Sequence, residues 1–275
     1  MKKYNRIILM AGLLALVVLL SACGTGDVDA NSTGIWSRYI IYYFGEAIQA
    51  LSFGSVGVGI ILFTIIIRII LMPLMHFQTK SMRKTQELQP KIKALQQKYA
   101  SRDQETQAKL QAETKKLYAE HNVNPYAGCL PLVVQMPVMI ALYQSILRVP
   151  ALRQGQFMWL DLSAPDPYFI LPILAAIFTF ASTYLSSMSQ LESNPSTKIM
   201  TFFMPVMIFV MGMNLASGLS LYWVVSNAFQ TVQTLLINNP FKIRQERAEE
   251  ARRIRQKERA LERAKNPKKK QKRKK

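Results

Sequence analysis

The sequence predicts an all-α membrane protein with five transmembrane helices around a polar groove, a cytoplasmic helical hairpin and an interfacial helix on the outer surface. Three observations support this fold class. Several apolar runs approach the roughly 20 residues that a helix needs to cross a bilayer. Half of the 275 residues are hydrophobic. Most of the net charge of +19 lies in two polar segments, residues 80–116 and 242–275.

The N-terminus has the pattern of a bacterial signal peptide. Three basic residues precede an apolar run at 7–20, which is too short for a stable span, so residues 1–22 are predicted to be removed. The run ends in Leu20-Ser21-Ala22-Cys23, which resembles the lipobox of lipoproteins. Cys23 is therefore predicted to carry lipid on the outer face. The alternative is an uncleaved anchor helix with an incidental cysteine.

Residues 23–54 are predicted to form a lipid-anchored outer segment. Its first part, 24–33, is small and polar and is predicted to be a tether. From Ile35 to Leu51 apolar residues recur at helical spacing, and Trp and Tyr among them favour a helix on the outer membrane surface. The alternative is a loop that packs on the membrane helices.

The first transmembrane helix is predicted at 55–78 and carries a single charge, Arg68, near its middle. At 1.5 Å per residue, Arg68 lies about 18 Å from the outer end of the apolar run and about 13 Å from the other. An arginine at this depth costs about 2.5–3.5 kcal/mol on insertion scales. Thr64 lies one turn earlier on the same face. We expect this helix to line a wet cavity with Arg68 as its floor; the alternative is an arginine that only fixes helix packing.

Residues 79–125 are predicted to form a cytoplasmic hairpin of two helices. Lys80, Arg83 and Lys84 open the segment, and the positive-inside rule places them in the cytoplasm. A turn is predicted at 101–103, and thin apolar faces indicate a hairpin that packs mostly on itself and is mobile. Binding to lipid headgroups or to a partner, and solvation with no partner, are both left open.

Four more transmembrane helices are predicted, at residues 126–148, 168–190, 198–214 and 218–238. An outer loop at 149–167 and a cytoplasmic loop at 191–197 connect them. A basic cytoplasmic tail follows at 239–275. It suits an anionic partner, RNA phosphate or acidic lipid, or it only fixes the topology.

Three of these helices carry polar residues among their apolar ones. The second transmembrane helix has Gln135, the third has a stripe ending in Gln190, and the fifth has Trp223, Asn227 and Gln230 at helical spacing. A single stripe is equally well explained by interhelical hydrogen bonds, worth roughly 0.6 kcal/mol each. Together with the intramembrane arginine, the stripes predict one shared groove.

The sequence offers no catalytic signature. It has no clustered Cys, His or carboxylates, so neither a metal nor another cofactor is expected. It has no phosphate-binding glycine loop and no nucleophile elbow. Cys129 is interpreted as a small buried apolar residue. The chain is therefore not expected to be an enzyme.

Three motifs resemble the YidC membrane insertases. The run Asn124-Pro125-Tyr126-Ala127-Gly128-Cys129-Leu130-Pro131 and its continuation to Val138 resemble the second-span signature of that family. Ile67-Arg68 with Pro73 resembles the first span, and Leu219 to Asn227 resembles the last. The large outer domain of Gram-negative members is missing. With its lipobox and short outer segment, the chain is similar to the Gram-positive, SpoIIIJ-like form.

The resemblance implies a five-helix core whose groove is open to the cytoplasm and to lipid but closed outside. It implies insertion of small membrane proteins, alone or beside the Sec translocon. Arg68 matches the groove arginine of the family, and Thr64 and Trp223 match positions that face the substrate. The hairpin matches one thought to receive substrates, and the tail matches a ribosome-contacting end. The stripes add further groove residues, namely Gln135, Gln190, Asn227 and Gln230.

Two other functions are left open at this point. One is a transporter of small anionic solutes with Arg68 at its midplane, which favours an internal repeat and a second gate that the sequence does not show. The other is a structural lipoprotein, in which the packing of Arg68 matters more than the sign of its charge. In every case, we expect a multi-pass protein of the bacterial cell membrane with its N-terminus outside and its C-terminus in the cytoplasm.

Overall fold

The computed structural model describes residues 26–101, 103–124, 130–188, 195–237 and 239–265. The predicted signal peptide, the predicted lipidation site Cys23, Cys129 and Gln190 lie outside this part of the chain. The described residues are almost entirely helical, which confirms the predicted all-α class. The strands within them are two residues long, β1 (Gln156–Phe157) and β2 (Leu160–Asp161), paired antiparallel.

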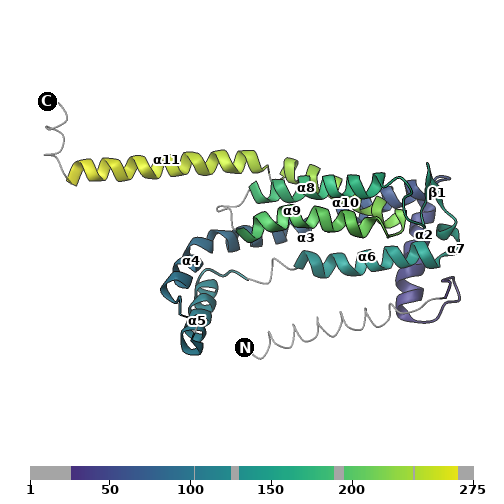
Figure 1. Ribbon diagram of the computed structural model, residues 1–275, viewed down its shortest axis with the longest axis horizontal. Helices are drawn as coiled ribbons and strands as arrows, with labels where there is room; N and C mark the ends of the chain where they lie inside the picture. The colour runs from purple at the N-terminus through teal and green to yellow at the C-terminus, as the bar shows by residue number, and fades with distance from the viewer. Residues whose placement is uncertain (1–25, 102, 125–129, 189–194, 238, 266–275) are drawn as a thin grey trace.

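Five long helices run side by side as a bundle (Figure 1): α3 (Val56–Glu87), α6 (Leu130–Arg148), α8 (Ile170–Met188), α9 (Pro195–Gly212) and α10 (Ser217–Ile237). Helix α10 is central, because it contacts α3, α6 and α8, and α9 packs on α8. Among the residues that the structure describes, two helical stretches are long and apolar enough to cross a membrane, Val56–Lys98 and Ile170–Met188; Val133–Arg148 and Ile199–Gly212 are shorter apolar helices. The count of five spans stays a prediction.

Helix α3 is longer than the transmembrane segment expected at 55–78. It continues to Glu87, so the basic residues after position 78 belong to the same helix. Charge marks where a helix leaves the membrane, but it does not interrupt backbone hydrogen bonding. The change of element comes at α4 (Gln89–Lys98), with Pro90 in its first turn, where the missing amide proton costs little.

The hairpin consists of α4 and α5 (Gln104–Glu120), and it lies at one end of the bundle (Figure 1). Leu88, Ile92 and Val123 are buried together, with Leu117 and Tyr118 packed against them. The predicted apolar faces therefore meet, although the sequence analysis did not identify Val123. This small cluster holds the two helices of the hairpin against each other.

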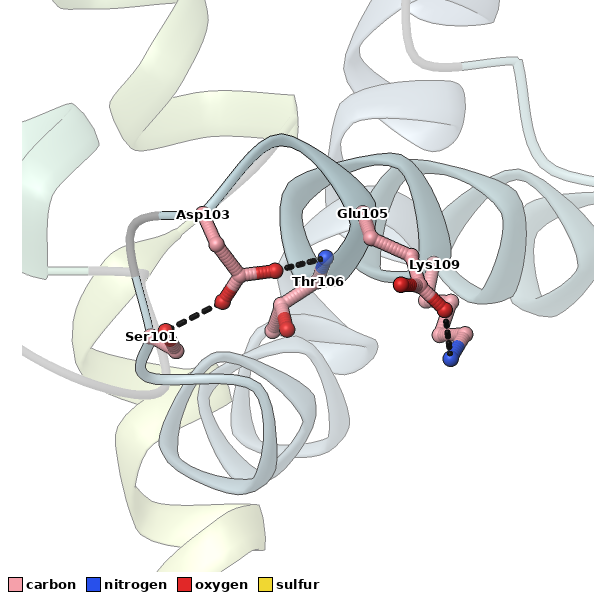
Figure 2. A network of polar contacts seen from close by, with 5 residues as sticks. All are labelled: Ser101, Asp103, Glu105, Thr106 and Lys109. Atoms are coloured by element: carbon pink, nitrogen blue, oxygen red, sulfur yellow. Dashed lines mark hydrogen bonds and ion pairs between the residues drawn. The ribbon is translucent and has the colours of Figure 1, made fainter.

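Asp103 starts helix α5 as its N-cap. Its carboxylate accepts a hydrogen bond from the Thr106 amide at 2.7 Å and another from the Ser101 hydroxyl (Figure 2). At the start of the same helix, Glu105 and Lys109 form an ion pair at 2.7 Å, also drawn in Figure 2. That pair is exposed and so adds little stability, whereas the cap satisfies an amide that has no partner within the helix.

A π-helical segment, η1 (Trp36–Ile41), and α2 (Tyr42–Ala50) cross the opposite end of the bundle (Figure 1). Ile41 and Ile48 are fully buried against the bundle, while Ile35 and Tyr39 stay exposed on the other side. The segment is thus helical as predicted, and one face packs on the membrane helices. Its position at the outer membrane surface stays a prediction.

The end of the bundle beside α2 is densely packed. The β1–β2 hairpin follows the short α7 (Pro150–Arg153) in the chain. It lies so close to α3 that a Cβ added at Gly57 would overlap the ring of Phe157. A Cβ at Gly218 would lie 2.8 Å from Ile146 Cδ1 and 3.1 Å from the Leu162 carbonyl oxygen. Glycine is needed at both positions because no side chain fits between these elements.

The segment after the predicted lipid anchor is docked on this end of the bundle. Val28 is 1% exposed, and its amide donates to the Arg148 carbonyl at 2.7 Å. Arg148 Nε donates to the Gly26 carbonyl at 2.8 Å, and Asp27 pairs with Arg153 at 2.8 Å. Residues 26–28 of the predicted tether at 24–33 are therefore held on the bundle, by contacts that composition does not reveal.

Asp166 organises the loop before α8. It is 1% exposed and accepts hydrogen bonds from Trp159 Nε1 at 3.1 Å and from the amides of Tyr168 and Leu171 at 3.1 and 2.8 Å. The sequence analysis treated this residue as part of an outer loop. Its carboxylate instead satisfies buried donors that would otherwise have no partner.

We expect Asp166→Ala to destabilise the bundle, because it leaves three donors without an acceptor. The loss should be roughly 2–4 kcal/mol in the free energy of unfolding. Asp161→Ala is the matched control, since Asp161 is exposed and its carboxylate bonds nearby Ser163, and it should cost about 0.5 kcal/mol. Unfolding in detergent measures both, and equal losses would contradict the role of Asp166.

The cap of α5 should depend on pH. The Ser101 hydroxyl, and after it the Thr106 amide, lower the pKa of Asp103 to about 2. A depressed pKa means that the cap is intact above the usual value of about 3.9 and is lost as pH falls from there through the folded value. In Ser101→Ala, carboxyl carbon NMR of Asp103 should show this pKa moving back toward 3.9. An unchanged pKa would contradict the assignment, and Lys109→Ala serves as the control.

Candidate functional site

Polar side chains meet inside the bundle along helix α10. Helix α3 brings Arg68, α6 brings Gln135, and α10 itself supplies Asn227 and Gln230. These side chains approach because α10 contacts each of the other two helices. The structure thus places a polar contact of α3 and one of α6 on α10, at Gln230 and Tyr222, and the shared groove stays a prediction.

Arg68 is partly buried and has one polar partner. Its Nη1 donates to Gln230 Oε1 at 3.4 Å, the long end of hydrogen-bond distances. Within the described part of the chain, no carboxylate lies within ion-pair distance of Arg68. Among the described residues, the hydrogen-bond acceptor that faces this charge is a neutral amide. Such a guanidinium is suited to attract an anion, because most of its five N–H donors remain available.

Asn227 and Gln135 each connect α10 to a neighbouring helix. Asn227 Oδ1 accepts from the Ser182 hydroxyl of α8 at 3.3 Å, and its Nδ2 donates to the Trp223 carbonyl at 2.9 Å. Gln135 Nε2 of α6 donates to the Tyr222 hydroxyl. For these residues the structure shows interhelical hydrogen bonds, the alternative left open for a single stripe.

The polar stripe of α8 is satisfied mostly within its own helix. The hydroxyls of Thr179, Thr183 and Ser186 donate to backbone carbonyls three or four residues earlier, at 2.6, 2.7 and 2.8 Å. Hydroxyl groups bonded in this way present little free hydrogen-bonding capacity to a groove. For these three hydroxyls the structure thus shows bonds within α8, and Gln190 lies outside the described residues.

Thr64 and Trp223 are both buried in this structure. Thr64 is 1% exposed and its hydroxyl donates to the Ile60 carbonyl at 2.6 Å, while Trp223 belongs to the apolar core. Neither side chain faces an open space here. The one-turn spacing that places Thr64 beside Arg68 does not by itself give the two residues the same surroundings.

The structure adds residues that sequence reasoning missed. Tyr222 and Ser182 are the partners of Gln135 and Asn227. Ser182 follows Thr179 by three residues, a spacing that could have placed it on the α8 stripe. Nothing in the sequence indicates that Tyr222 is the partner of Gln135. Gln78 is 2% exposed, and neither amide atom bonds to a described residue. Buried atoms of this kind normally bond water or another partner.

These features define an α-helical bundle in which a long apolar helix carries an arginine. The family model described as 60Kd inner membrane protein matches residues 48–246. The chain belongs to this family, whose curated members with high identity are named YidC insertases. The resemblance of the three motifs is thereby confirmed.

The curated relatives match almost the whole chain. Membrane protein insertase YidC of Enterococcus faecalis is 71% identical over 275 residues, which is 100% of both chains. Membrane protein insertase YidC 1 of Lactococcus lactis is 55% identical over 244 residues, covering 88% of this chain and 90% of the relative.

A solved structure supports the same assignment. It is described as an active YidC insertase crystal structure with the first transmembrane domain resolved. It matches with a TM-score of 0.58 at 30% identity, over 73% of this chain and 47% of the solved one. The match thus spans about half the length of that protein.

We expect Thr64→Val to leave function nearly unchanged. Valine keeps the shape of threonine, and the lost hydroxyl bonds only to its own helix, so membrane-protein insertion should fall less than about twofold. Gln230→Leu, which removes the partner of Arg68, is the comparison and should have the larger effect. The assay is insertion of a single-span protein into proteoliposomes. A severe loss in Thr64→Val at normal abundance would show that its hydroxyl acts outside α3.

Proposed function

We propose that this chain inserts newly made membrane proteins into the bacterial cell membrane and assists their folding, which is supported by its relatives being named membrane protein insertases. The observation that carries the proposal is Arg68, a cation within a bundle helix whose partner among the described residues is a neutral amide at 3.4 Å. The comparisons name insertases and give no support to a small-anion transporter.

The proposed mechanism lowers the barrier to translocation. The outer segment of a substrate is polar and often acidic, and each unpaired peptide group costs several kcal/mol in hydrocarbon. A hydrated groove that reaches partway across the membrane shortens this crossing. Arg68 attracts substrate carboxylates into the groove by Coulomb attraction, which is stronger there than in bulk water. No covalent bond is made or broken, so the proposed activity is not enzymatic.

The substrate's apolar segment then moves onto lipid-facing helices. Helix α9 exposes large apolar side chains along its length, among them Met200, Phe202, Phe203, Val206 and Val210. The dense packing beside α2 supports a groove closed at that end. Gln135, Gln190, Trp223 and Asn227 stay proposed groove residues, reached when the bundle opens for a substrate.

The proposed topology places the α2 end outside and the hairpin end in the cytoplasm. In this arrangement the signal peptide is removed and Cys23 carries lipid on the outer face. The α4–α5 hairpin receives substrates, and α11 (Pro240–Lys265) with the basic tail contacts the ribosome or acidic lipid. Helix α11 is exposed and extends from the bundle beyond α8, which supports a role in binding (Figure 1). The Sec translocon is a further proposed partner.

The test is insertion of single-span substrates by Arg68→Lys, Arg68→Ala and Arg68→Glu. With an acidic outer segment, lysine should retain most activity and alanine should lose about tenfold, which corresponds to about 1.4 kcal/mol. Glutamate should lose more, because it repels the substrate. A matched substrate with a neutral outer segment should be affected much less. Normal insertion by all three variants at wild-type abundance would contradict the proposal.

A further inference from the structure

Arg38 of η1 is a second cation that forms no ion pair with a described residue. Its guanidinium lies over the ring of Tyr42, with 5.3 Å from Cζ to the ring centroid. No residue in the described ranges accepts a hydrogen bond from this guanidinium, and Nη1 is shielded from solvent. A charged group in this position is costly unless an anion completes its surroundings.

The surface beside Arg38 is apolar. Ile35, Tyr39 and Tyr43 follow one another at four-residue intervals and are 79, 63 and 53% exposed. We call these three residues the Ile35 ridge. An exposed row of isoleucine and tyrosine beside an arginine is typical of a segment at the boundary between hydrocarbon and lipid headgroups.

The π-helical segment is held firmly on the bundle. Trp36 Nε1 donates to Gln144 Oε1 of α6 at 3.2 Å, and Gln144 Oε1 also accepts from Arg148 Nη1 at 3.1 Å. The next residue after η1 continues directly into α2, whose Ile48 is buried. Arg38 is therefore presented from a fixed backbone, which favours binding of one ligand in a defined pose.

The Arg38 guanidinium is suited to bind a phosphate group. The Nε–Nη2 edge of the guanidinium is not among its buried atoms and presents two parallel N–H groups that match two phosphate oxygens. This pairing strengthens at the low dielectric of the membrane interface. The acid of the segment from Ile35 to Ala50 is Glu46, which is exposed and forms no ion pair with Arg38. No carboxylate of η1 or α2 thus competes for the guanidinium.

We propose that Arg38, backed by the Tyr42 ring, binds the phosphate of an anionic phospholipid, with the acyl chains of that lipid along the Ile35 ridge. A phosphatidylglycerol fits better than a zwitterionic lipid, because a choline headgroup brings its own cation to the phosphate. In the proposed topology this lipid lies in the outer leaflet of the membrane. The site itself does not depend on insertion activity.

The experiment is titration of the full-length protein in detergent with phosphatidylglycerol, followed by native mass spectrometry. Arg38→Gln should weaken binding of the first lipid by about tenfold, and Arg38→Lys by about threefold, because lysine keeps the charge but loses the fork. Arg153→Gln is the matched control. It removes an arginine at the same end of the bundle that already pairs with Asp27, and it should stay within about twofold of wild type.

Wild-type affinity in Arg38→Gln would overturn the proposal. If that variant does not fold, Arg38→Lys decides, and wild-type affinity there would overturn the bidentate site. Arg68→Glu separates this proposal from the proposed function: it should bind the lipid like wild type even though it no longer inserts substrates. Loss of lipid binding in Arg68→Glu would contradict the assignment of the site to Arg38.

Discussion

A positive charge within an apolar helix is the constraint on which the rest of the bundle depends. Burying Arg68 among hydrocarbon alone would cost several kcal/mol, so the surrounding helices must supply polar contacts or water. The structure supplies Gln230 at 3.4 Å and, on the same helix, the hydrogen bonds of Asn227. One weak contact to a neutral amide does not offset the desolvation of a guanidinium. The remaining stabilisation is proposed to come from water in the groove and, during insertion, from the substrate.

The two ends of the bundle differ in how they are built. Beside α2, close helix contacts, the β1–β2 hairpin, the docked segment at 26–28 and the Asp166 network fill the space with apolar side chains and satisfied hydrogen bonds. Toward the hairpin end, α3 continues past the apolar region and carries Gln78, whose buried amide lacks a described partner. The dense packing at the α2 end agrees with the proposed groove being closed there.

Much of this could be predicted from the sequence. Apolar runs and the positions of basic residues predicted the helical class and the hairpin, and the polar stripes with the lone charge predicted a shared groove, which stays a prediction. The sequence could not predict the partner of each polar group. Thr64 and Thr183 lie on predicted polar faces, yet both bond their own helix, because a hydroxyl can fold back onto a carbonyl one turn earlier. Contacts between distant segments, such as Val28 with Arg148 or Gln135 with Tyr222, have no local signature.

The most direct test of the central claim is whether water reaches the Arg68 partner position from one side only. Gln230→Cys, in a chain with Cys129→Ser, would be treated with a membrane-impermeant thiol reagent from the cytoplasmic side of inverted vesicles and from the outside of intact cells. The buried Ser145→Cys, close to the packed end, is the control. A hydrated groove open to the cytoplasm predicts labelling of Gln230→Cys from the cytoplasmic side alone and no labelling of the control. Labelling from the outside, or from neither side, would contradict the account.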